Sequence, residues 1–305
     1  MEIVSVYNDK GGVGKSSTVL EIGVALATSG KRILLLDNDP QGSLSVSLIK
    51  NINEVSAGMD AVYRGEISFI DAITDTFVEN LFIIPSGRSL KNEYFRSDDR
   101  IIDRVDEMIS TFKTDQNFLD LFDIVIIDNP PVQDGTALYC TLSANRIIIP
   151  VVPDDVCFDG LVRTYQFLEK QCPDFMEKKI IIVPTLFKNR SLHKKYLAAI
   201  KKGYHKKNDN TIVSAAVISD RSEVPESISM KQILFISHAA SESANQYKQI
   251  CLDVFPWIEK EEFLGLLSTA AENKKKAARD RFKKMIEDRK KLKEEIKIET
   301  EAVNV

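Results

Sequence analysis

The feature that most constrains the fold of this 305-residue chain is a glycine-rich loop between an apolar run and a helical pattern. The loop "KGGVGKSS", residues 10–17, follows the apolar run "IVSVY" at residues 3–7. The residues behind the glycines, 16–29, have the composition of a helix. A strand, a tight turn and a helix in this order are typical of α/β domains, in which the helix returns across the sheet to the next strand.

Further short apolar runs recur along the chain, each followed by turn residues and a helical pattern. Most of them lack the alternation of a strand that faces water on one side, so they indicate strands buried on both faces of a parallel sheet. The predicted strands are 3–7, 32–37, 81–85, 122–128, 146–152, 179–185 and 211–218, and the predicted helices include 16–29, 100–112, 158–171, 191–202 and 239–253. We therefore predict a doubly wound α/β fold, with a mostly parallel sheet flanked by helices.

The overall composition is that of a globular protein without a large excess of positive charge. Apolar residues make up 44% of the chain and charged residues 28%, and the formal net charge is −4. Any binding to DNA must therefore come from a local basic patch. The chain has 4 cysteines and no CxxC pair, which favours reduced thiols. We expect no signal peptide and no transmembrane segment, because a strand-like stretch opens the chain and no apolar run approaches about 20 residues.

The glycine-rich loop has the residues that a phosphate-binding loop requires. Its glycines let backbone N–H groups surround a phosphate, and the start of the following helix adds partial positive charge. We expect Lys15 to reach the terminal phosphates of a nucleotide and the Ser16 hydroxyl to ligate Mg²⁺. The predicted nucleotide-binding residues are Gly11, Gly12, Val13, Gly14, Lys15, Ser16 and Ser17.

Two further apolar runs end in aspartates. The run "LLLDNDPQGS" contains Asp37 and Asp39, so that one carboxylate can face a metal ion and the other the terminal phosphate and its water. The run "FDIVIIDNPP" contains Asp128 in a Walker B pattern, in which the carboxylate holds Mg²⁺, usually through water. The predicted metal site consists of Ser16, Asp37 and Asp128.

A second lysine, Lys10, stands ahead of the glycines and makes the loop resemble the deviant Walker A motif of the ParA/MinD family of ATPases. In that family the early lysine acts across a subunit interface. The resemblance therefore implies an ATP-bound sandwich homodimer in which Lys10 reaches the partner's nucleotide. It also implies a P-loop NTPase fold with ATP and Mg²⁺ as cofactors. The catalytic residues that it implies are Lys10, Lys15 and Asp39, of which Asp39 orients or activates the attacking water.

The resemblance covers nearly the whole chain before the C-terminal tail. The element "DNDPQG" and the run "IIIPVVPDDVCFDGL" match the family pattern, and the matches together span roughly residues 1–255. Residues 50–120 match only in their pattern of elements. The family's D-x-P-P-x-x-G element is one residue longer here, and the additional carboxylate, Asp134, has no assigned role.

The element "DPQG" favours the ParA branch of the family over MinD. The cysteines are not placed to bridge an iron–sulfur cluster, as related carrier ATPases require. The resemblance to ParA implies that ATP dimers bind nonspecific DNA and that a ParB-like centromere-binding adaptor stimulates slow hydrolysis. Such a protein would act in the cytoplasm, in association with the nucleoid, on a plasmid or a chromosome. Because the first strand begins at residue 2 or 3, we expect no operator-reading domain before it.

The predicted DNA contacts are basic residues late in the core. DNA binding without sequence preference requires lysines and arginines on one face, and its affinity falls steeply with salt. The segment "ISDRSEVPES" resembles an arginine-containing segment of the family but is one residue shorter. The candidates for DNA contact are Arg190, Lys194, Lys195, Lys201, Lys202 and Arg221, with Lys206 and Lys207 nearby.

The composition changes near Trp257. Residues 268–297 carry 12 Lys/Arg against 6 Asp/Glu, with no proline or glycine, and so predict a charged helical tail. We predict an ATPase domain over residues 1–258 and a C-terminal extension over residues 259–305. Three interpretations of the tail stay open: a solvated or weakly coiled-coil helix, a contact with DNA or a partner, and a MinD-like amphipathic membrane helix.

Two alternative functions follow from these features. A MinD-like positioning ATPase would use the tail to associate with a membrane, which we do not expect but leave open. An ATP-gated DNA-binding scaffold would bind nucleotide with negligible turnover. The sequence also leaves open the cargo, the identity of the adaptor and the formation of filaments.

Overall fold

The computed structural model describes residues 1–55, 57–87, 99–133, 135–274 and 276. Within these residues the strands form one eight-stranded sheet in the order β3-β4-β2-β5-β1-β6-β7-β8. Every neighbouring pair of strands is parallel except β3 with β4. The strands are β1 (Glu2–Val6), β2 (Ile33–Asp37), β3 (Thr74–Asp75), β4 (Leu81–Ile84), β5 (Ile124–Asp128), β6 (Arg146–Val151), β7 (Lys179–Pro184) and β8 (Thr211–Val213).

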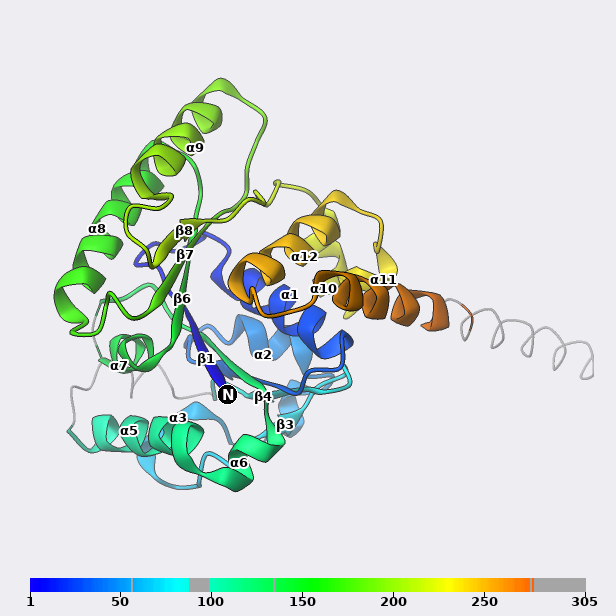
Figure 1. Cartoon of the computed structure of the whole chain (residues 1–305). Helices are drawn as coiled ribbons and strands as arrows, with labels where there is room; N and C mark the ends of the chain where they lie inside the picture. Colours follow the sequence, from blue (N-terminus) through cyan, green and yellow to red (C-terminus); the bar gives the residue numbers. More distant parts are fainter. Residues whose placement is uncertain (56, 88–98, 134, 275, 277–305) are drawn as a thin grey trace, which may run out of the picture.

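Helices cover both faces of this sheet (Figure 1). One layer contains α1 (Lys15–Thr28), α2 (Ser43–Leu48), α10 (Glu223–Ser229), α11 (Leu234–Ser237) and α12 (Glu242–Val254). The other layer contains α3 (Met59–Arg64), α5 (Asp99–Thr114), α6 (Gln116–Leu121), α7 (Gly135–Ser143), α8 (Asp155–Gln171) and α9 (Ser191–Tyr204). A short 3₁₀ helix, η1 (Ile52–Glu54), follows α2. The predicted doubly wound α/β fold is therefore confirmed.

The central strands are buried on both faces because each consists of an unbroken run of large apolar side chains. In β2, Ile33 and Leu35 belong to the hydrophobic cluster shared with α1 and α12. Leu34 and Leu36 belong to the cluster shared with α3 and α5. Since successive side chains of a strand point to opposite faces, a strand without polar alternation needs a helix layer on each side.

The strand order brings the carboxyl ends of β1, β2 and β5 side by side. β1 pairs with β5 on one side and with β6 on the other, although both follow it late in the chain. In doubly wound sheets, ligand sites form outside the carboxyl ends of strands, where the strand order changes direction. The glycine-rich loop and the two aspartate-containing turns therefore open at the same edge of the sheet.

The last predicted strand is shorter than expected. We predicted a strand over residues 211–218, but β8 ends at Val213. The Asp253 carboxylate of α12 accepts hydrogen bonds from Ser214 Oγ at 2.6 Å and from the Ala215 backbone N–H at 2.8 Å. The regular ladder with β7 is interrupted where these bonds form, and a backbone bond to β7 returns at Ile218, whose N–H donates to the Pro184 carbonyl oxygen at 2.8 Å.

Several short elements were not predicted. They have between 2 and 9 residues, which is too short for a hydrophobic period to stand out. The unpredicted elements are β3, α2, η1, α3, α6, α7, α10 and α11.

Ordered packing continues beyond residue 258, where we predicted the end of the ATPase domain. Residues 260–274 are helical and lie beside α11 and α12 (orange in Figure 1). Their buried side chains Phe263 and Leu267 belong to the same hydrophobic cluster as α1 and α12. The division into two domains stays a prediction, and most of the predicted tail, residues 277–305, lies outside the described residues.

All four cysteines are free thiols, and Cys140, Cys172 and Cys251 are buried. Burial raises the pKa of the Cys140 thiol to about 12, so this group stays protonated. Among the residues that the structure describes, no helix has both the length and the apolar character needed to cross a membrane.

Glu21 of α1 is a carboxylic acid inside the helix layer. It is 2% exposed, and its Oε2 atom has no hydrogen-bond partner among the described residues. Burial raises the pKa of Glu21 to about 8, because the apolar interior disfavours the charged carboxylate. The side chain is therefore protonated in the folded chain at neutral pH.

We expect Glu21→Gln to stabilise the folded chain, increasingly so as the pH rises. Unfolded, Glu21 loses its proton near its ordinary pKa of 4.5, whereas folded it keeps the proton up to a pKa of about 8. Between these values the native free energy of unfolding falls with rising pH, by up to about 1.4 kcal/mol per pH unit. Urea denaturation at pH 5 and pH 8 measures the effect. The same pH dependence in both proteins would contradict it.

Candidate functional site

The loop after β1 has two glycines in the left-handed backbone region. Gly12 has a φ of 72° and Gly14 a φ of 84°, where a side chain would add strain. Helix α1 begins directly after the loop at Lys15, and no side chain caps its first N–H groups. The backbone donors of the loop and of the first helical turn are therefore available to an anion.

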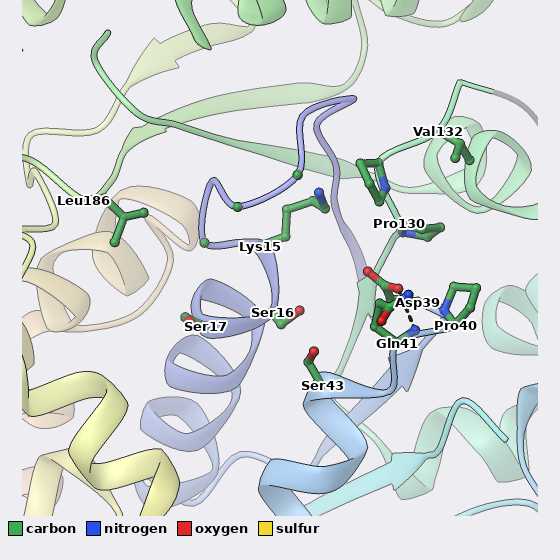
Figure 2. A pocket seen from close by; sticks show the side chains of 14 residues that line it. Lys15, Ser16, Ser17, Asp39, Pro40, Gln41, Ser43, Pro130, Val132 and Leu186 are labelled. Atoms are coloured by element: carbon green, nitrogen blue, oxygen red, sulfur yellow. Dashed lines mark hydrogen bonds between the residues drawn. The ribbon is translucent and has the colours of Figure 1, made fainter. Parts of the chain in front are cut away.

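A cavity of about 640 Å³ lies in front of the loop. In Figure 2, Lys15, Ser16 and Ser17 line it from the start of α1. Residues 39–41, between β2 and α2, and the first residue of α2, Ser43, border it from another side. Its lining residues are Gly11, Gly12, Gly14, Lys15, Ser16, Ser17, Asp39, Pro40, Gln41, Ser43, Pro130, Pro131, Val132 and Leu186. Most of the predicted nucleotide-binding residues thus surround one cavity.

Val13 is the predicted nucleotide-binding residue that does not line this cavity. Its side chain is 1% exposed, and its carbonyl oxygen accepts a hydrogen bond from Thr185 Oγ1 at 2.8 Å. Val13 therefore attaches the loop to the end of β7. A side chain at this position packs inside the protein, while its glycine neighbours face the cavity.

The ammonium of Lys15 is buried beneath the loop. Lys15 is 6% exposed, and its Nζ atom donates hydrogen bonds to the carbonyl oxygens of Lys10 at 2.9 Å and Asn8 at 3.3 Å. Burial lowers the pKa of Lys15, while the charges of Asp128 and Asp39 act in the opposite direction. The loop carbonyls thus hold a cationic side chain at the base of the cavity.

Asp37 and Asp128 stand next to each other at the ends of β2 and β5. They are partners in the parallel register, and both are 0% exposed. Asp37 Oδ2 accepts hydrogen bonds from the Ser45 backbone N–H at 2.8 Å and from Ser45 Oγ at 2.5 Å. Within the described residues, the other oxygen of Asp37 and both oxygens of Asp128 have no hydrogen-bond partner.

Burial raises the pKa values of both carboxyls. The pKa of Asp37 rises to about 6, although the bonds from Ser45 oppose the shift. The pKa of Asp128 rises well above its ordinary value through burial and through the charge of Asp37, with the Ser16 hydroxyl acting in the opposite direction. Two adjacent buried acids with free oxygens are unfavourable as anions unless a cation joins them.

The pair fits a hard divalent cation. Mg²⁺ at phosphate sites takes one or two carboxylates and completes its coordination with water and phosphate oxygens. The described residues contain no group of three or more His, Cys, Asp or Glu side chains that could hold a metal ion by themselves. The partnerless oxygens of Asp37 and Asp128, together with the nearby Ser16 hydroxyl, match the smaller donor set.

Asp39 borders the cavity on the side opposite the loop (Figure 2). Its Oδ1 atom accepts a hydrogen bond from the Gln41 backbone N–H at 2.9 Å, which orients the carboxylate within its own turn. Unlike Asp37, it is partly exposed. Asp37 is therefore a buried carboxylate, whereas the carboxylate of Asp39 is accessible to water in the cavity.

Lys10 does not line the cavity of its own subunit. Its side chain lies along α8, where the stem contacts Gly160. The other predicted catalytic and metal-binding residues lie together at one edge of the sheet: Lys15, Ser16, Asp37, Asp39 and Asp128. Lys10 instead lies against α8.

The four candidate lysines of α9 share one face of the helix. Lys194 and Lys201 are two turns apart, as are Lys195 and Lys202, so they form one stripe. All four lysines are exposed, whereas Ile200 of the same helix is buried. We call these four lysines the α9 basic stripe.

The two candidate arginines differ in their surroundings. Arg190 immediately precedes α9, and its Nη2 atom lies 2.9 Å from His193 Nε2. Arg221 pairs with Glu242 of α12. Arg190 therefore adjoins the α9 basic stripe, while Arg221 is engaged in an ion pair on the other side of the sheet.

A second cavity of about 230 Å³ adjoins the first. The two share Gly14, Ser17 and Leu186. The remaining lining of the second cavity is Thr185, Ile218, Ser219, Asp220, Arg221, Val224, Pro225, Ile228 and Tyr247. A space with apolar walls thus extends from the start of α1 toward α10.

Sequence reasoning missed three residues that shape the site. Ser45 orients Asp37, Thr185 holds the loop, and Leu186 lines both cavities. Thr185 and Val13 lie 172 residues apart in sequence. No local pattern marks these residues, because their roles depend on contacts between distant segments.

Comparisons with known proteins agree with this geometry. A family model described as an AAA domain matches residues 1–182. The sporulation initiation inhibitor protein Soj of Bacillus subtilis is 25% identical over 215 residues, which cover 70% of this chain and 83% of that protein. The chromosome partitioning protein ParA of Caulobacter vibrioides is 26% identical over 176 residues, which cover 56% of this chain and 63% of that protein. The match to ParA thus spans less than two thirds of its length.

Two solved structures have a similar fold. A plasmid partition protein from Borrelia burgdorferi B31, bound to AMPPNP, aligns with a TM-score of 0.67 at 20% identity, over 83% of this chain and 98% of that one. The septum site-determining protein MinD from Pyrococcus horikoshii, complexed with Mg-ADP, aligns with a TM-score of 0.64 at 20% identity, over 83% of this chain and 95% of that one. These likenesses show a shared fold.

We expect Asp128→Asn to stabilise the chain at high pH when divalent cations are absent. Because burial raises the pKa of Asp128 above its ordinary 3.8, the native free energy of unfolding falls as the pH rises toward that raised value. Asparagine carries no such charge. Urea denaturation in EDTA should show a gain of roughly 1–3 kcal/mol at pH 8 and a smaller one at pH 5.

The matched control for this experiment is Asp209→Asn, at an exposed aspartate. It should show no gain that depends on pH. If Asp128→Asn lowers the free energy of unfolding equally at pH 5 and pH 8, the buried charge of Asp128 does not destabilise the native chain and the prediction is wrong.

Proposed function

This chain belongs to the AAA-domain family of P-loop ATPases of the ParA/MinD type, and we propose that it is a ParA-like ATPase whose ATP-dependent dimerisation switches its binding to nonspecific DNA. With a ParB-like centromere-binding adaptor it would drive the segregation of a plasmid or a chromosome. The observation that carries the proposal is the convergence of the glycine loop, Lys15 and three aspartates at one edge of the sheet.

The two adjoining cavities have the chemistry of a nucleotide site. Backbone N–H groups of the loop and of the first turn of α1 would receive the phosphates. Lys15 would exchange its bonds to the Lys10 and Asn8 carbonyl oxygens for bonds to phosphate oxygens. The second, more apolar cavity, which begins at Gly14 and Ser17, would take the base. The two proteins of similar fold were solved with AMPPNP and with Mg-ADP, which supports nucleotide binding by this chain.

The metal site would consist of Asp37, Asp128 and the Ser16 hydroxyl. The free oxygens of the two buried carboxyls are the reason for this choice. When bound, Mg²⁺ would neutralise negative charge on the phosphates during transfer. Ser45 would keep Asp37 oriented through the two hydrogen bonds that it donates.

Hydrolysis of ATP to ADP and phosphate would depend on Asp39 and the two lysines. Asp39 borders the cavity and is partly exposed, so it can orient a water molecule toward the terminal phosphate. Lys15 would stabilise the negative charge that develops there. A slow reaction, stimulated by the adaptor, would let the ATP state last long enough to act as a switch.

Dimerisation would place Lys10 at the nucleotide of the partner subunit. Lys10 lies outside its own cavity, in agreement with a role in another subunit. Phosphate charge enclosed between two subunits needs additional cations, so a lysine that crosses the interface makes association depend on ATP.

The α9 basic stripe would be the main DNA contact. Its lysines are exposed and lie on one face, so several can reach phosphates at the same time. Arg190 would extend this surface, and Arg221 would need to leave Glu242 in order to contribute. We place the working protein in the cytoplasm, on the nucleoid.

We expect this protein to bind DNA in an ATP-dependent manner that requires Lys10. Fluorescence anisotropy with a random-sequence duplex at low and moderate salt, with ATP, ADP or no nucleotide, measures this binding. Binding should be strong only with ATP, should weaken as salt rises, and should be lost in Lys10→Ala. Binding that is equal in all nucleotide states, or absent at low salt, would refute the DNA switch.

We expect replacement of the α9 basic stripe to weaken DNA binding and its salt dependence. Each lysine that contacts a phosphate contributes about 0.9 to the slope of log K against log salt. Changing all four lysines to alanine should lower the magnitude of the slope by roughly 2–4. An unchanged slope would exclude the stripe as the DNA contact.

A charge-matched control accompanies the stripe variant. It removes four exposed lysines from other parts of the surface: Lys50, Lys113, Lys170 and Lys260. The control should keep most of the native slope. Equal losses in both variants would mean that total charge, rather than the stripe, controls binding.

A further inference from the structure

One face of α8 receives the segment that leads from β1 into the glycine loop. Gly160, Arg163 and Thr164 are spaced by three and four residues, which places them on one side of the helix. Arg163 pairs with Asp9 at 3.7 Å, and Thr164 Oγ1 accepts a hydrogen bond from the Asp9 backbone N–H at 3.4 Å. These two contacts hold the segment against α8.

Gly160 provides the space for the side chain of Lys10. A Cβ atom at position 160 would lie 2.6 Å from Cγ and 3.0 Å from Cε of Lys10. Any residue other than glycine would therefore displace the stem of Lys10. Gly160 lies inside α8, where glycine is a poor helix former, and its backbone is not in the left-handed region. Close approach to Lys10 accounts for glycine here.

The backbone and the side chain of Lys10 are held in different ways. Its carbonyl oxygen accepts a hydrogen bond from Lys15 Nζ, and its N–H donates to Asn8 Oδ1, both at 2.9 Å. Within the described residues, the Lys10 ammonium forms no hydrogen bond or ion pair. The side chain can therefore leave Gly160 by rotating about its own bonds, without breaking a polar contact.

We propose that Gly160 is a seat for the Lys10 stem, which keeps this side chain on its own subunit until the nucleotide of a partner attracts it across the interface. The seat would thereby set how readily two ATP-bound subunits associate. This inference rests on the proposed dimerisation function. Gly160 acts through Lys10 and is therefore a positioning residue.

The direction of the effect follows from a two-state equilibrium. Lys10 is seated in the free subunit and crosses to the partner in the dimer. A substitution that raises only the free energy of the seated arrangement favours the dimer. Removing the seat should therefore strengthen association, whereas removing the lysine should weaken it.

Gly160→Ala tests this inference in the full-length chain. Sedimentation equilibrium with Mg²⁺ and AMPPNP measures the dissociation constant of the dimer. We expect a value about fivefold lower than for the native chain, because the seated side chain loses packed methylene contacts. The matched control is Gly265→Ala, in the helix over residues 260–274, where an added Cβ has no atom within 4 Å. It should leave the dissociation constant unchanged.

A second measurement tests the contact without a dimer. In the nucleotide-free chain, Gly160→Ala and Lys10→Ala should be coupled in urea denaturation, with the alanine at position 160 more stabilising when Lys10 is absent. The two changes should be additive if no seat exists. Additivity, or a dissociation constant that is unchanged or raised in Gly160→Ala, would overturn the proposal.

The outcome for Lys10→Ala separates this inference from the proposed function. If the native chain fails to associate in AMPPNP, the proposed ATP-dependent dimer is wrong. If Lys10→Ala associates as well as the native chain does, the proposed crossing of Lys10 to the partner is wrong. If Lys10→Ala loses association while Gly160→Ala behaves as the native chain, only the seat is wrong.

Discussion

The buried carboxyl pair at the ends of β2 and β5 is the constraint on which the site depends. Asp37 and Asp128 are register partners, both are fully buried, and three of their oxygens have no partner among the described residues. Such a pair raises the free energy of the folded chain unless it holds a proton or a cation. Lys15 is buried close enough for Asp128 to influence its pKa. The interior thus holds two carboxyl groups and one ammonium group close together. A bound cation would stabilise the carboxylates, and a bound phosphate would stabilise the ammonium.

Helix α8 connects the nucleotide edge of the sheet with the basic side of the molecule. One of its faces holds the segment before the glycine loop through Thr164 and Gly160. Near its start, Asp155 accepts a hydrogen bond from the Tyr196 hydroxyl of α9, and the rings of Phe158 and Tyr196 are 5.7 Å apart. Helix α8 is therefore the element that contacts both the segment before the glycine loop and α9.

The fold was predictable where a single segment carries its own signal. The runs that form β2 and β5 predicted strands buried on both faces, because four consecutive large apolar residues precede the aspartate in each. The end of β8 was not predictable, because the residues that follow it bond to Asp253 of α12, which is distant in sequence. The same holds for the helix over residues 260–274, whose Phe263 and Leu267 are buried only because distant helices form their cluster.

The local features of the site can be read from the sequence: a glycine loop after a strand, a lysine at the start of a helix, and aspartates at the ends of two apolar runs. These are local properties of backbone conformation and burial. Three contacts became visible only in the folded chain: Asp37 lies beside Asp128, Val13 is attached to Thr185, and Lys10 rests on Gly160. Each of these contacts joins segments far apart in the chain. Their proximity depends on the strand order and on the packing of helices over the sheet, which no local pattern contains.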